Sequence, residues 1–210
     1  FISSDHRIRR VDVRTGIITT LAGIGKNRSS GDGGAATEAA MRDPRGLAVD
    51  PTGNLFFAEN GSGRIRRIDN ETGIITTFAG GGIGNPREKI FGDGGPATEA
   101  MVKLPDDVVI GKDGNLYIAT DNRIRKIDIT TGIIDTIAGT GDRGLDGDGN
   151  LATEVGLAEP VGVAIDAKGN IYIADRDNHR VRKVDAGTGI MTTLAGVGKH
   201  HTRPGEFYRA

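Results

Sequence analysis

The sequence predicts an all-β protein made of repeated four-stranded antiparallel sheets. First, residues 160–196 contain four short runs rich in Val, Ile, Thr and Tyr, each followed by Gly, Asn or Asp, which is typical of strands joined by tight turns. Second, the tripeptide Thr-Gly-Ile recurs at Thr15, Thr72, Thr131 and Thr188, at intervals of 57, 59 and 57 residues. Repetition at this period, with four strands in each unit, indicates the blades of a β-propeller.

The best-preserved unit indicates where the four strands of a blade lie. Its strands are expected at Val161–Asp166, Asn170–Asp175, Arg180–Asp185 and Ile190–Ala195. Turns that contain Gly separate them, because Gly adopts positive φ angles without a steric clash at Cβ. In the first complete copy the corresponding strands are expected near residues 45–50, 54–59, 64–69 and 74–79.

The repeat also divides the chain into blades. We expect a partial blade at residues 1–43, complete blades at 44–104, 105–159 and 160–198, and a divergent C-terminal tail at 199–210. Because the first copy lacks its first strand, the sequence indicates a segment of a larger, six-bladed propeller, which at this period needs roughly 340 residues. A closed four-bladed ring is the alternative, if Phe207–Ala210 or another chain supplies the missing inner strand. An unclosed array favours self-association through its open blade edges.

Three motifs of the last unit carry a resemblance to a known family. Asn170–Asp175 (NIYIAD), Asn178–Val181 (NHRV) and Thr188–Ile190 (TGI) resemble the NHL repeat, and the connector Gly92–Ala100 (GDGGPATEA) is similar to the long connectors of bacterial NHL proteins. The resemblance covers almost the whole chain and implies an NHL-type β-propeller. It also implies a choice of functions, because similar propellers include binding modules, lyases and lactonases.

Composition excludes several classes of function. The chain has 27 basic and 28 acidic residues and a formal net charge of −1, so no global field attracts nucleic acid or an anionic membrane surface. Cys is absent, so the chain has no disulfide and no thiolate site. We therefore expect neither a nucleic-acid nor a membrane partner, and we favour an extracellular or periplasmic location.

The expected topology places the binding surface at one end of the blades. Strand direction alternates, so the turns between second and third strands lie at the same end as the long connectors, residues 23–43, 80–104 and 139–159. Loops on a rigid scaffold usually carry function. We predict a ligand-binding surface there, at positions where the copies differ. These positions are Arg45, Asn60, Asp106, Asp107, Asp121 and Asp177.

Asp107 is a particular departure from the repeat. It replaces the Gly that the other copies have at Gly46 and Gly162. A Gly at this place indicates close approach of a neighbouring backbone. Two interpretations remain open at this stage: neutral drift, or a ligand contact at the mouth of the central channel.

Asp146, Asp148 and Asn150 have the spacing that begins a calcium loop. The Gly and Glu that such a loop needs at its sixth and twelfth positions are absent. Only Asp148 has acidic counterparts in the other copies, at Asp32 and Asp93. We therefore expect Asp32, Asp93 and Asp148 to bond nearby backbone amides in Asx turns. Calcium is the weaker alternative, and no tightly bound catalytic metal or other cofactor is expected.

The third strands are rich in Arg and begin at Arg7, Arg64 and Arg123. Because strand neighbours point to opposite faces, some of these Arg side chains are buried between blades and need carboxylate partners. Glu59 and Asp175, which end second strands, are the expected partners. An exposed ligand surface is the alternative.

Catalytic constellations are weak in this sequence. His6 and His179 occupy equivalent loops two blades apart, where we expect hydrogen bonds within the loop, and the other two His lie in the tail. Amidating lyases place three His around the channel, which the repeats here do not supply. Glu59, Asp121 and Asp175 could imitate the acidic metal ligands of lactonase-like propellers, although each also fits the repeat.

Three hypotheses of function follow. The first is a noncatalytic binding scaffold that recognises a protein, peptide or glycan through the connector face. The alternative is a propeller lyase or a lactonase-type hydrolase with a divalent cation in the central channel. The third is a structural part of a larger surface or secreted protein.

Overall fold

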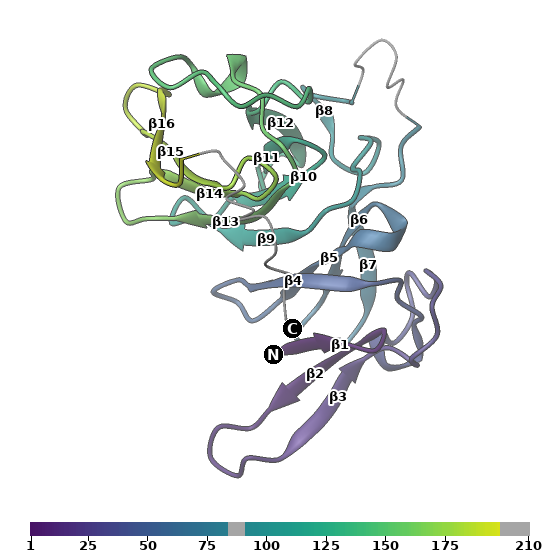
Figure 1. Cartoon of the computed structure of the whole chain (residues 1–210). Coiled ribbons are helices and arrows are strands. Elements are labelled where there is room, and N and C mark those ends of the chain that lie inside the picture. The colour runs from purple at the N-terminus through teal and green to yellow at the C-terminus, as the bar shows by residue number, and fades with distance from the viewer. Residues whose placement is uncertain (84–90, 198–210) are drawn as a thin grey trace, which may run out of the picture.

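Four antiparallel sheets follow one another along the chain in the computed structural model, which describes residues 1–83 and 91–197 (Figure 1). The N-terminal sheet consists of β1 (Ile2–Ser4), β2 (Arg7–Val11) and β3 (Ile18–Ala22). The first blade consists of β4 (Pro44–Val49), β5 (Leu55–Glu59), β6 (Arg64–Ile68) and β7 (Ile75–Gly80). The second consists of β9 (Asp107–Ile110), β10 (Leu116–Thr120), β11 (Arg123–Ile127) and β12 (Ile133–Ala138). The third consists of β13 (Pro160–Ile165), β14 (Ile171–Asp175), β15 (Arg180–Val184) and β16 (Met191–Ala195).

These sheets confirm the predicted fold class of four-stranded antiparallel blades. Within each blade the strands pair in chain order, and every strand expected in the first and third blades lies within one residue of its predicted bounds. The Arg-rich segments are strands β6 and β11, as the repeat predicted. The expected six-bladed ring stays a prediction, and the predicted tail at 199–210 lies outside the described residues.

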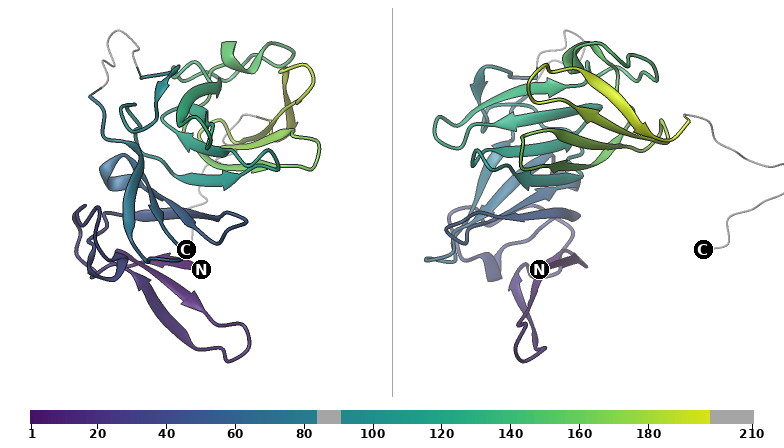
Figure 2. Two further views of the ribbon diagram at one scale, coloured as in Figure 1. Left: turned by 180° about the vertical axis from the view of Figure 1, so that it is seen from behind. Right: turned by 90° about the vertical axis from the view of Figure 1, so that its left-hand side faces the viewer.

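The blades are arranged around an inner row of first strands. Figures 1 and 2 show the sheets fanning out in succession, with the N-terminal sheet at one end of the array and the third blade at the other. The Gly46 N–H donates to the Asp106 carbonyl oxygen at 3.0 Å, so β4 and β9 approach each other directly. Three apolar clusters fill the spaces between consecutive sheets. Each fully buried Ile or Phe contributes about 1.5–3 kcal/mol there.

The connectors also cover the outer edge of the next blade. The second connector forms β8 (Gly95–Pro96), which pairs with β12. Single β-bridges at the equivalent place join Ala35 to Ile74 and Leu151 to Ile190. The helical turn expected from the Ala and Glu of the first connector is a 3-10 turn, η1 (Ala36–Glu38), and its counterpart in the third connector is η3 (Ala152–Glu154). A further 3-10 turn, η2 (Asn60–Ser62), joins β5 to β6. The outermost strands of the three blades are therefore protected from edge-to-edge pairing.

A buried Arg occupies the middle of each third strand. Arg66, Arg125 and Arg182 are at most 1% exposed and follow a β-bulge that recurs in every sheet. The expected partners are confirmed: the Arg66 guanidinium lies 3.1 Å from the Glu59 carboxylate, and that of Arg182 lies 3.6 Å from Asp175.

The connector carboxylates Asp32, Asp93 and Asp148 complete these ion pairs. Asp32 lies 2.7 Å from Arg66, Asp148 lies 2.9 Å from Arg182, and Asp93 pairs with Arg125. The expectation that these residues bond nearby backbone amides in Asx turns was wrong. Because the buried guanidinium of the next blade needs a carboxylate, each Asp reaches across to that blade instead.

The turns between first and second strands lie at the opposite end of the blades. In the second blade, the Asp113 carboxylate accepts hydrogen bonds from Asn115 Nδ2 at 2.7 Å and the Tyr117 hydroxyl at 2.9 Å, and it pairs with Lys126 at 3.0 Å. Burial raises the pKa of Asp113, but the hydrogen bonds from Asn115, Lys126 and Tyr117 outweigh it and lower that pKa to about 2. In the folded chain, Asp113 is therefore ionised at any pH well above 2.

This low pKa predicts a stability change in acid. From its ordinary pKa of 3.8 in the unfolded chain, Asp113 contributes stability that is present above pH 4 and lost as the pH falls through 2. After discounting for its 40% exposed side chain, the contribution is about 1 kcal/mol. Urea titrations at pH 5 and pH 2 give the loss of free energy of unfolding between the two pH values. This loss should be about 1 kcal/mol larger in the wild-type chain than in Asp113→Asn. Equal losses would contradict the assignment.

Candidate functional site

A cavity of about 360 Å³ opens at the connector end, between the first strands of the three blades. We call it the connector-face cavity. Its lining is polar and charged and comes from all three blades and from the third connector. The lining residues are Arg45, Asn60, Leu104, Asp106, Asp121, Asn122, Arg143, Glu159, Pro160 and Arg176. Four of the six residues predicted for a ligand-binding surface are among them: Arg45, Asn60, Asp106 and Asp121.

The residue that precedes the opening proline of each blade has an unusual backbone. Asp43, Leu104 and Glu159 have φ angles of 52°, 42° and 49°, in the left-handed region. A residue before proline ordinarily adopts an extended conformation, and a left-handed non-Gly residue costs about 1–3 kcal/mol. Leu104 and Glu159 line the cavity, and Asp43 pairs with a lining Arg. Strained backbone therefore surrounds the cavity at equivalent points.

Arg45 is fixed on one side of the cavity. Its guanidinium lies 2.9 Å from the Asp43 carboxylate and also bonds Asp106. Asn60 Nδ2 donates to the Pro105 carbonyl oxygen at 3.2 Å, which fixes the turn after β5 against the second blade. These contacts join the first two blades beneath the cavity.

Arg143 and Arg176 are fixed on the other side by two shared carboxylates. Arg143 lies 2.7 Å from Glu159 and 2.8 Å from Asp177, while Arg176 lies 3.1 Å from Asp177 and also pairs with Glu159. Asp177, the fifth predicted residue, therefore holds two lining residues in place. The hydrogen bond from Arg176, followed by that from Arg143, lowers the pKa of Asp177.

Asp121 is the lining carboxylate with unused bonding capacity. Among the described residues its side chain accepts no hydrogen bond, and its nearest cations, Lys103 and Arg123, lie 3.7 Å and 3.9 Å away. Leu104 also lines the cavity, with 60% of its surface exposed. The cavity therefore offers one acceptor and one apolar contact, whereas its Arg side chains are already paired.

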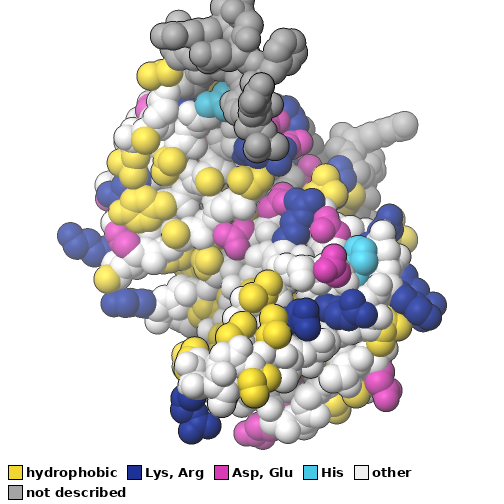
Figure 3. All heavy atoms as spheres, turned by 60° about the horizontal axis from the view of Figure 1, so that its bottom comes forward, with side chains coloured by type: hydrophobic (Ala, Val, Ile, Leu, Met, Phe, Trp, Pro, Cys, Tyr) yellow, Lys and Arg dark blue, Asp and Glu magenta, His cyan; other side chains and the backbone are white. Residues whose placement is uncertain are grey.

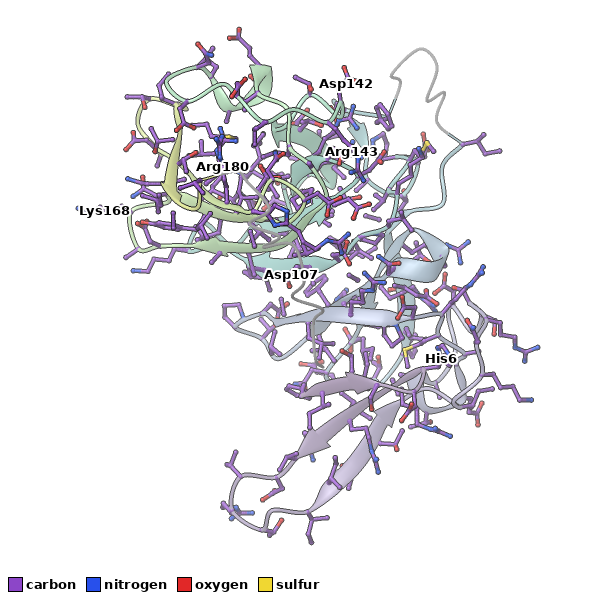
Figure 4. The ribbon with its side chains drawn as sticks, viewed as in Figure 1. His6, Asp107, Asp142, Arg143, Lys168 and Arg180 are labelled. Atoms are coloured by element: carbon purple, nitrogen blue, oxygen red, sulfur yellow. The ribbon has the colours of Figure 1, made fainter. Side chains whose placement is uncertain are left out.

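Asp107 does not line this cavity. One carboxylate oxygen accepts the Val163 N–H of β13 at 3.1 Å, and the other accepts the Val108 N–H at 2.9 Å. Burial raises the pKa of Asp107. A Cβ on Gly46 would lie 2.6 Å from the Asp107 Cα, which explains why Gly46 has no side chain. Asp107, labelled at the start of β9 in Figure 4, joins the first strands β9 and β13 through its bond to Val163, so we leave it out of the proposed ligand contacts.

Two of the three candidate calcium residues, Asp148 and Asn150, have other contacts. Asp148 accepts hydrogen bonds from the Thr193 N–H at 2.9 Å and the Thr193 hydroxyl at 3.0 Å, besides its pair with Arg182. The Asn150 backbone carbonyl accepts the Met191 N–H, which places this loop against β16. A cation at Asp148 would have to compete with a guanidinium.

The acidic residues considered for a lactonase-like metal site are dispersed. Glu59 and Asp175 are fully buried beside Arg66 and Arg182, whereas Asp121 lines the cavity. Within residues 1–83 and 91–197, no three His, Asp or Glu side chains gather as metal ligands. The Glu59 and Asp175 carboxylates stabilise the blades.

His6 differs from the expectation of hydrogen bonds within its own loop. Its Nδ1 accepts the Asp43 N–H at 3.2 Å, and Asn122 Oδ1 accepts the Glu159 N–H at 2.9 Å at the equivalent place. Side chains at this position therefore hold the strained pre-proline residue of the next blade. The two His of the tail lie outside the described residues.

Sequence reasoning missed six lining residues: Leu104, Asn122, Arg143, Glu159, Pro160 and Arg176. Leu104 and Glu159 precede blade-opening prolines, a position where the copies carry Asp, Leu and Glu. That difference was a usable signal of the same kind that identified Arg45 and Asp106.

None of the described helices is long and apolar enough to cross a membrane.

Comparison with protein families identifies matches in two parts of the chain. The model described as NHL repeat matches residues 157–184, and the model described as teneurin NHL domain matches residues 25–83. The chain is 30% identical over 196 residues to Protein SUPPRESSOR OF QUENCHING 1 of Arabidopsis thaliana, covering 90% of this chain and 18% of that protein. It is 28% identical to NHL repeat-containing protein 2 of Homo sapiens, covering 89% and 26%. The chain thus spans about a fifth to a quarter of these relatives.

Solved structures of low sequence identity share the fold. An auxiliary nutrient binding protein from Bacteroides ovatus superimposes with a TM-score of 0.55 and 20% identity, covering 93% of this chain and 53% of that chain. A chain of a nidogen/laminin complex gives 0.56 and 15%, covering 90% and 58%. A virginiamycin B lyase from Staphylococcus aureus gives 0.53 and 17%, covering 90% and 48%. At these identities the likeness concerns the fold alone.

Proposed function

Because this chain belongs to the NHL-repeat family of β-propeller proteins, we propose that it is a noncatalytic binding module that recognises a peptide or an exposed protein segment. The ligand enters the connector-face cavity and presents a Lys or Arg side chain. The observation that carries this proposal is that Asp121 and the exposed apolar side chain of Leu104 line the same cavity. Among the described residues the Asp121 carboxylate accepts no hydrogen bond and has only long ion pairs, to Lys103 at 3.7 Å and Arg123 at 3.9 Å.

A basic side chain matches both features of the cavity. Lys and Arg have an apolar stem and a charged head, so the stem packs on Leu104 while the head donates hydrogen bonds to Asp121. The lining cations Arg45, Arg143 and Arg176 are occupied by carboxylates. An acidic ligand would have to displace those partners, which favours a basic ligand over an acidic one. A neutral glycan offers Asp121 hydroxyl donors but no positive charge to pair with its carboxylate.

Asymmetry within the repeat supports a binding role. The three pre-proline positions have the same left-handed backbone but carry Asp43, Leu104 and Glu159. A scaffold of near-identical blades needs such differences to present an asymmetric site, and loops on a rigid scaffold commonly supply them. The nutrient binding protein and the nidogen/laminin complex, which share the fold, are consistent with ligand or protein binding by such propellers.

The enzyme alternative has less support from this chain's own residues. A lyase or lactonase-type reaction with a divalent cation in the channel needs a set of convergent ligands. Glu59 and Asp175 are bonded to buried Arg side chains instead. A hydrolytic or lyase activity that is lost on chelation and restored by zinc or calcium would favour that alternative.

Panning of a phage-displayed peptide library against the immobilised chain tests the proposal. We expect enrichment of peptides that contain Lys or Arg. Their affinity should fall at least about tenfold in Asp121→Asn, which removes the charge but suits the left-handed backbone, because hydrogen bonds to charged groups contribute about 1.5–3 kcal/mol. Leu104→Ala should also lower the affinity of the same peptides.

The matched control is Lys168→Glu. Lys168 lies in the turn between the first and second strands of the third blade, at the end opposite the connectors and far from Arg143 (Figure 4). If Lys168→Glu and Asp121→Asn lower the affinity of the selected peptides equally, the binding surface lies elsewhere. Enrichment of acidic peptides would contradict the predicted ligand chemistry, and selective binding on a glycan array would favour a carbohydrate ligand.

A further inference from the structure

The second blade differs from its neighbours at the end of its second strand. Glu59 and Asp175 end β5 and β14, are fully buried, and pair with the buried Arg66 and Arg182. Thr120 ends β10 at the equivalent register position and is only 2% exposed. Of the three complete blades, the second alone therefore has a neutral hydroxyl in place of the buried carboxylate.

The buried cations of the second blade are not reduced to match. Arg125 and Arg123 are 1% and 6% exposed, whereas Arg64 and Arg180, which stand at the position of Arg123 in the other blades, are only half-buried. The carboxylate that pairs with Arg125 belongs to Asp93, whose side chain is 42% exposed. Buried charges are costly unless they are paired. Figure 3 shows basic and acidic side chains side by side near the middle of the face that it presents, and the interior of the second blade lacks that balance.

A small cavity lies where the carboxylate is missing, with room for about one water-sized species. We call it the second-blade cavity. Three cations, one carboxylate, a hydroxyl and two apolar side chains line it. They are Phe91, Met101, Lys103, Thr120, Asp121, Arg123 and Arg125.

Positive charge exceeds negative charge in this lining. Its one carboxylate, Asp121, lies 3.7 Å from Lys103 and 3.9 Å from Arg123, so its ion pairs are long. Asp93 and Asp142 also attract Arg123 but lie outside the lining. Burial lowers the pKa of Arg123 although these carboxylates act to raise it. The carboxylates of the chain therefore do not fully offset the cost of burying this charge.

A backbone donor is also left over at this place. The Glu59 carboxylate accepts the Arg42 N–H at 2.6 Å, and the Asp175 carboxylate accepts the Ala158 N–H at 2.7 Å. Lys103 has the same position relative to its blade-opening proline, and among the described residues its N–H donates to no acceptor. The missing carboxylate therefore leaves both a positive charge and an N–H donor unmatched.

We propose that the second-blade cavity binds one monatomic anion, chloride in ordinary salt solutions. The anion takes the role that the Glu59 and Asp175 carboxylates have in the other blades: it balances the buried guanidinium and accepts the free N–H of Lys103. A water molecule of similar size supplies an acceptor but no charge, and polyatomic anions such as sulfate are too large for the cavity. This site is separate from the proposed peptide site, and neither proposal depends on the other.

Thermal unfolding in two salts of one ionic strength tests the proposal. Replacing roughly 0.2 M sodium gluconate by sodium chloride should raise the Tm of the wild-type chain by at least about 2 °C, because a ligand that binds only the folded chain stabilises it. Gluconate is too large to enter the cavity. Thr120→Glu supplies the carboxylate itself, so its Tm should be the same in both salts and should exceed that of the wild type in gluconate. Thr120→Val is the matched control, because it adds no charge at the same position, and it should keep the chloride response.

Crystals of the wild-type chain grown in sodium bromide locate the anion directly. Anomalous scattering should show a bromide beside Arg125 that is absent from Thr120→Glu. A water in the cavity without bromide overturns the proposal, as does a Tm rise of equal size in the wild type and Thr120→Glu. Glu88→Gln tests whether a carboxylate of this chain takes the place of the anion. A chloride response that appears in Glu88→Gln but not in the wild type also overturns the proposal.

Discussion

Replacing Glu59 by Ala should lower the free energy of unfolding by about 3 kcal/mol, because it removes the buried one of the two carboxylates that pair with the Arg66 guanidinium and leaves only the half-exposed Asp32. Arg66 and Glu59 are both fully buried and lie 3.1 Å apart. The Glu59 carboxylate also accepts the Arg42 N–H at 2.6 Å and the Ser29 hydroxyl at 2.9 Å. Its removal therefore takes one acceptor from three donors at once. Urea unfolding followed by circular dichroism measures the loss.

The second blade indicates why the cost depends on the partner that remains. Thr120 stands at the position of Glu59, and Arg125 donates instead to the Met101 carbonyl oxygen at 3.0 Å and pairs with Asp93. A double change of Glu59→Ala and Arg66→Met should therefore cost less than the sum of the two single changes, because it also removes the buried guanidinium that has lost Glu59. Additive costs, or a loss below about 1 kcal/mol for Glu59→Ala, would contradict the role assigned to this pair.

Replacing Gly139 by Ala should lower the free energy of unfolding by about 3 kcal/mol. Gly139 follows β12 with a φ of 89°, and a Cβ there would collide with the Asn122 carbonyl oxygen and lie 2.9 Å from the Arg123 Cα. Both obstacles are backbone atoms, so the second blade has to shift to make room. Thermal and urea unfolding measure this loss.

Gly132 provides a matched control for that prediction. It also has a left-handed backbone, with a φ of 72°, but a Cβ there meets no atom within 4 Å. Gly132→Ala should therefore cost only the left-handed conformation itself, about 1–2 kcal/mol. If the two variants lose the same stability, close approach at Gly139 contributes nothing beyond backbone conformation.

The strands could be predicted because their causes are local. Alternating β-branched residues and Gly turns recur in each copy, and the structure has strands within one residue of those predicted in the first blade. The pair of Arg66 with Glu59 was also predictable, since both lie on neighbouring strands of one blade. The pair of Arg182 with Asp148 was not, because these residues are 34 positions apart and belong to a strand and a connector. Only packing between consecutive blades brings them together.

The candidate site was predictable in place but not in chemistry. Differences between copies identified Arg45, Asn60, Asp106 and Asp121, which the fold brings together around one cavity. The left-handed backbone of Leu104 runs against the ordinary preference of a residue before proline. The exposure of Leu104 and its place beside the cavity could therefore be learned only from the structure.

The most direct test of the binding surface is an amide chemical-shift titration of the isotope-labelled chain with a Lys- or Arg-containing peptide selected from the library. Binding in the connector-face cavity predicts the largest shifts at Asn60, Leu104 and Asp121, with smaller shifts at the turns between first and second strands. Those turns lie at the opposite end of the blades and include Gly114 and Lys168. The largest shifts at Gly114 and Lys168, with none at Leu104 and Asp121, would contradict the proposed binding surface.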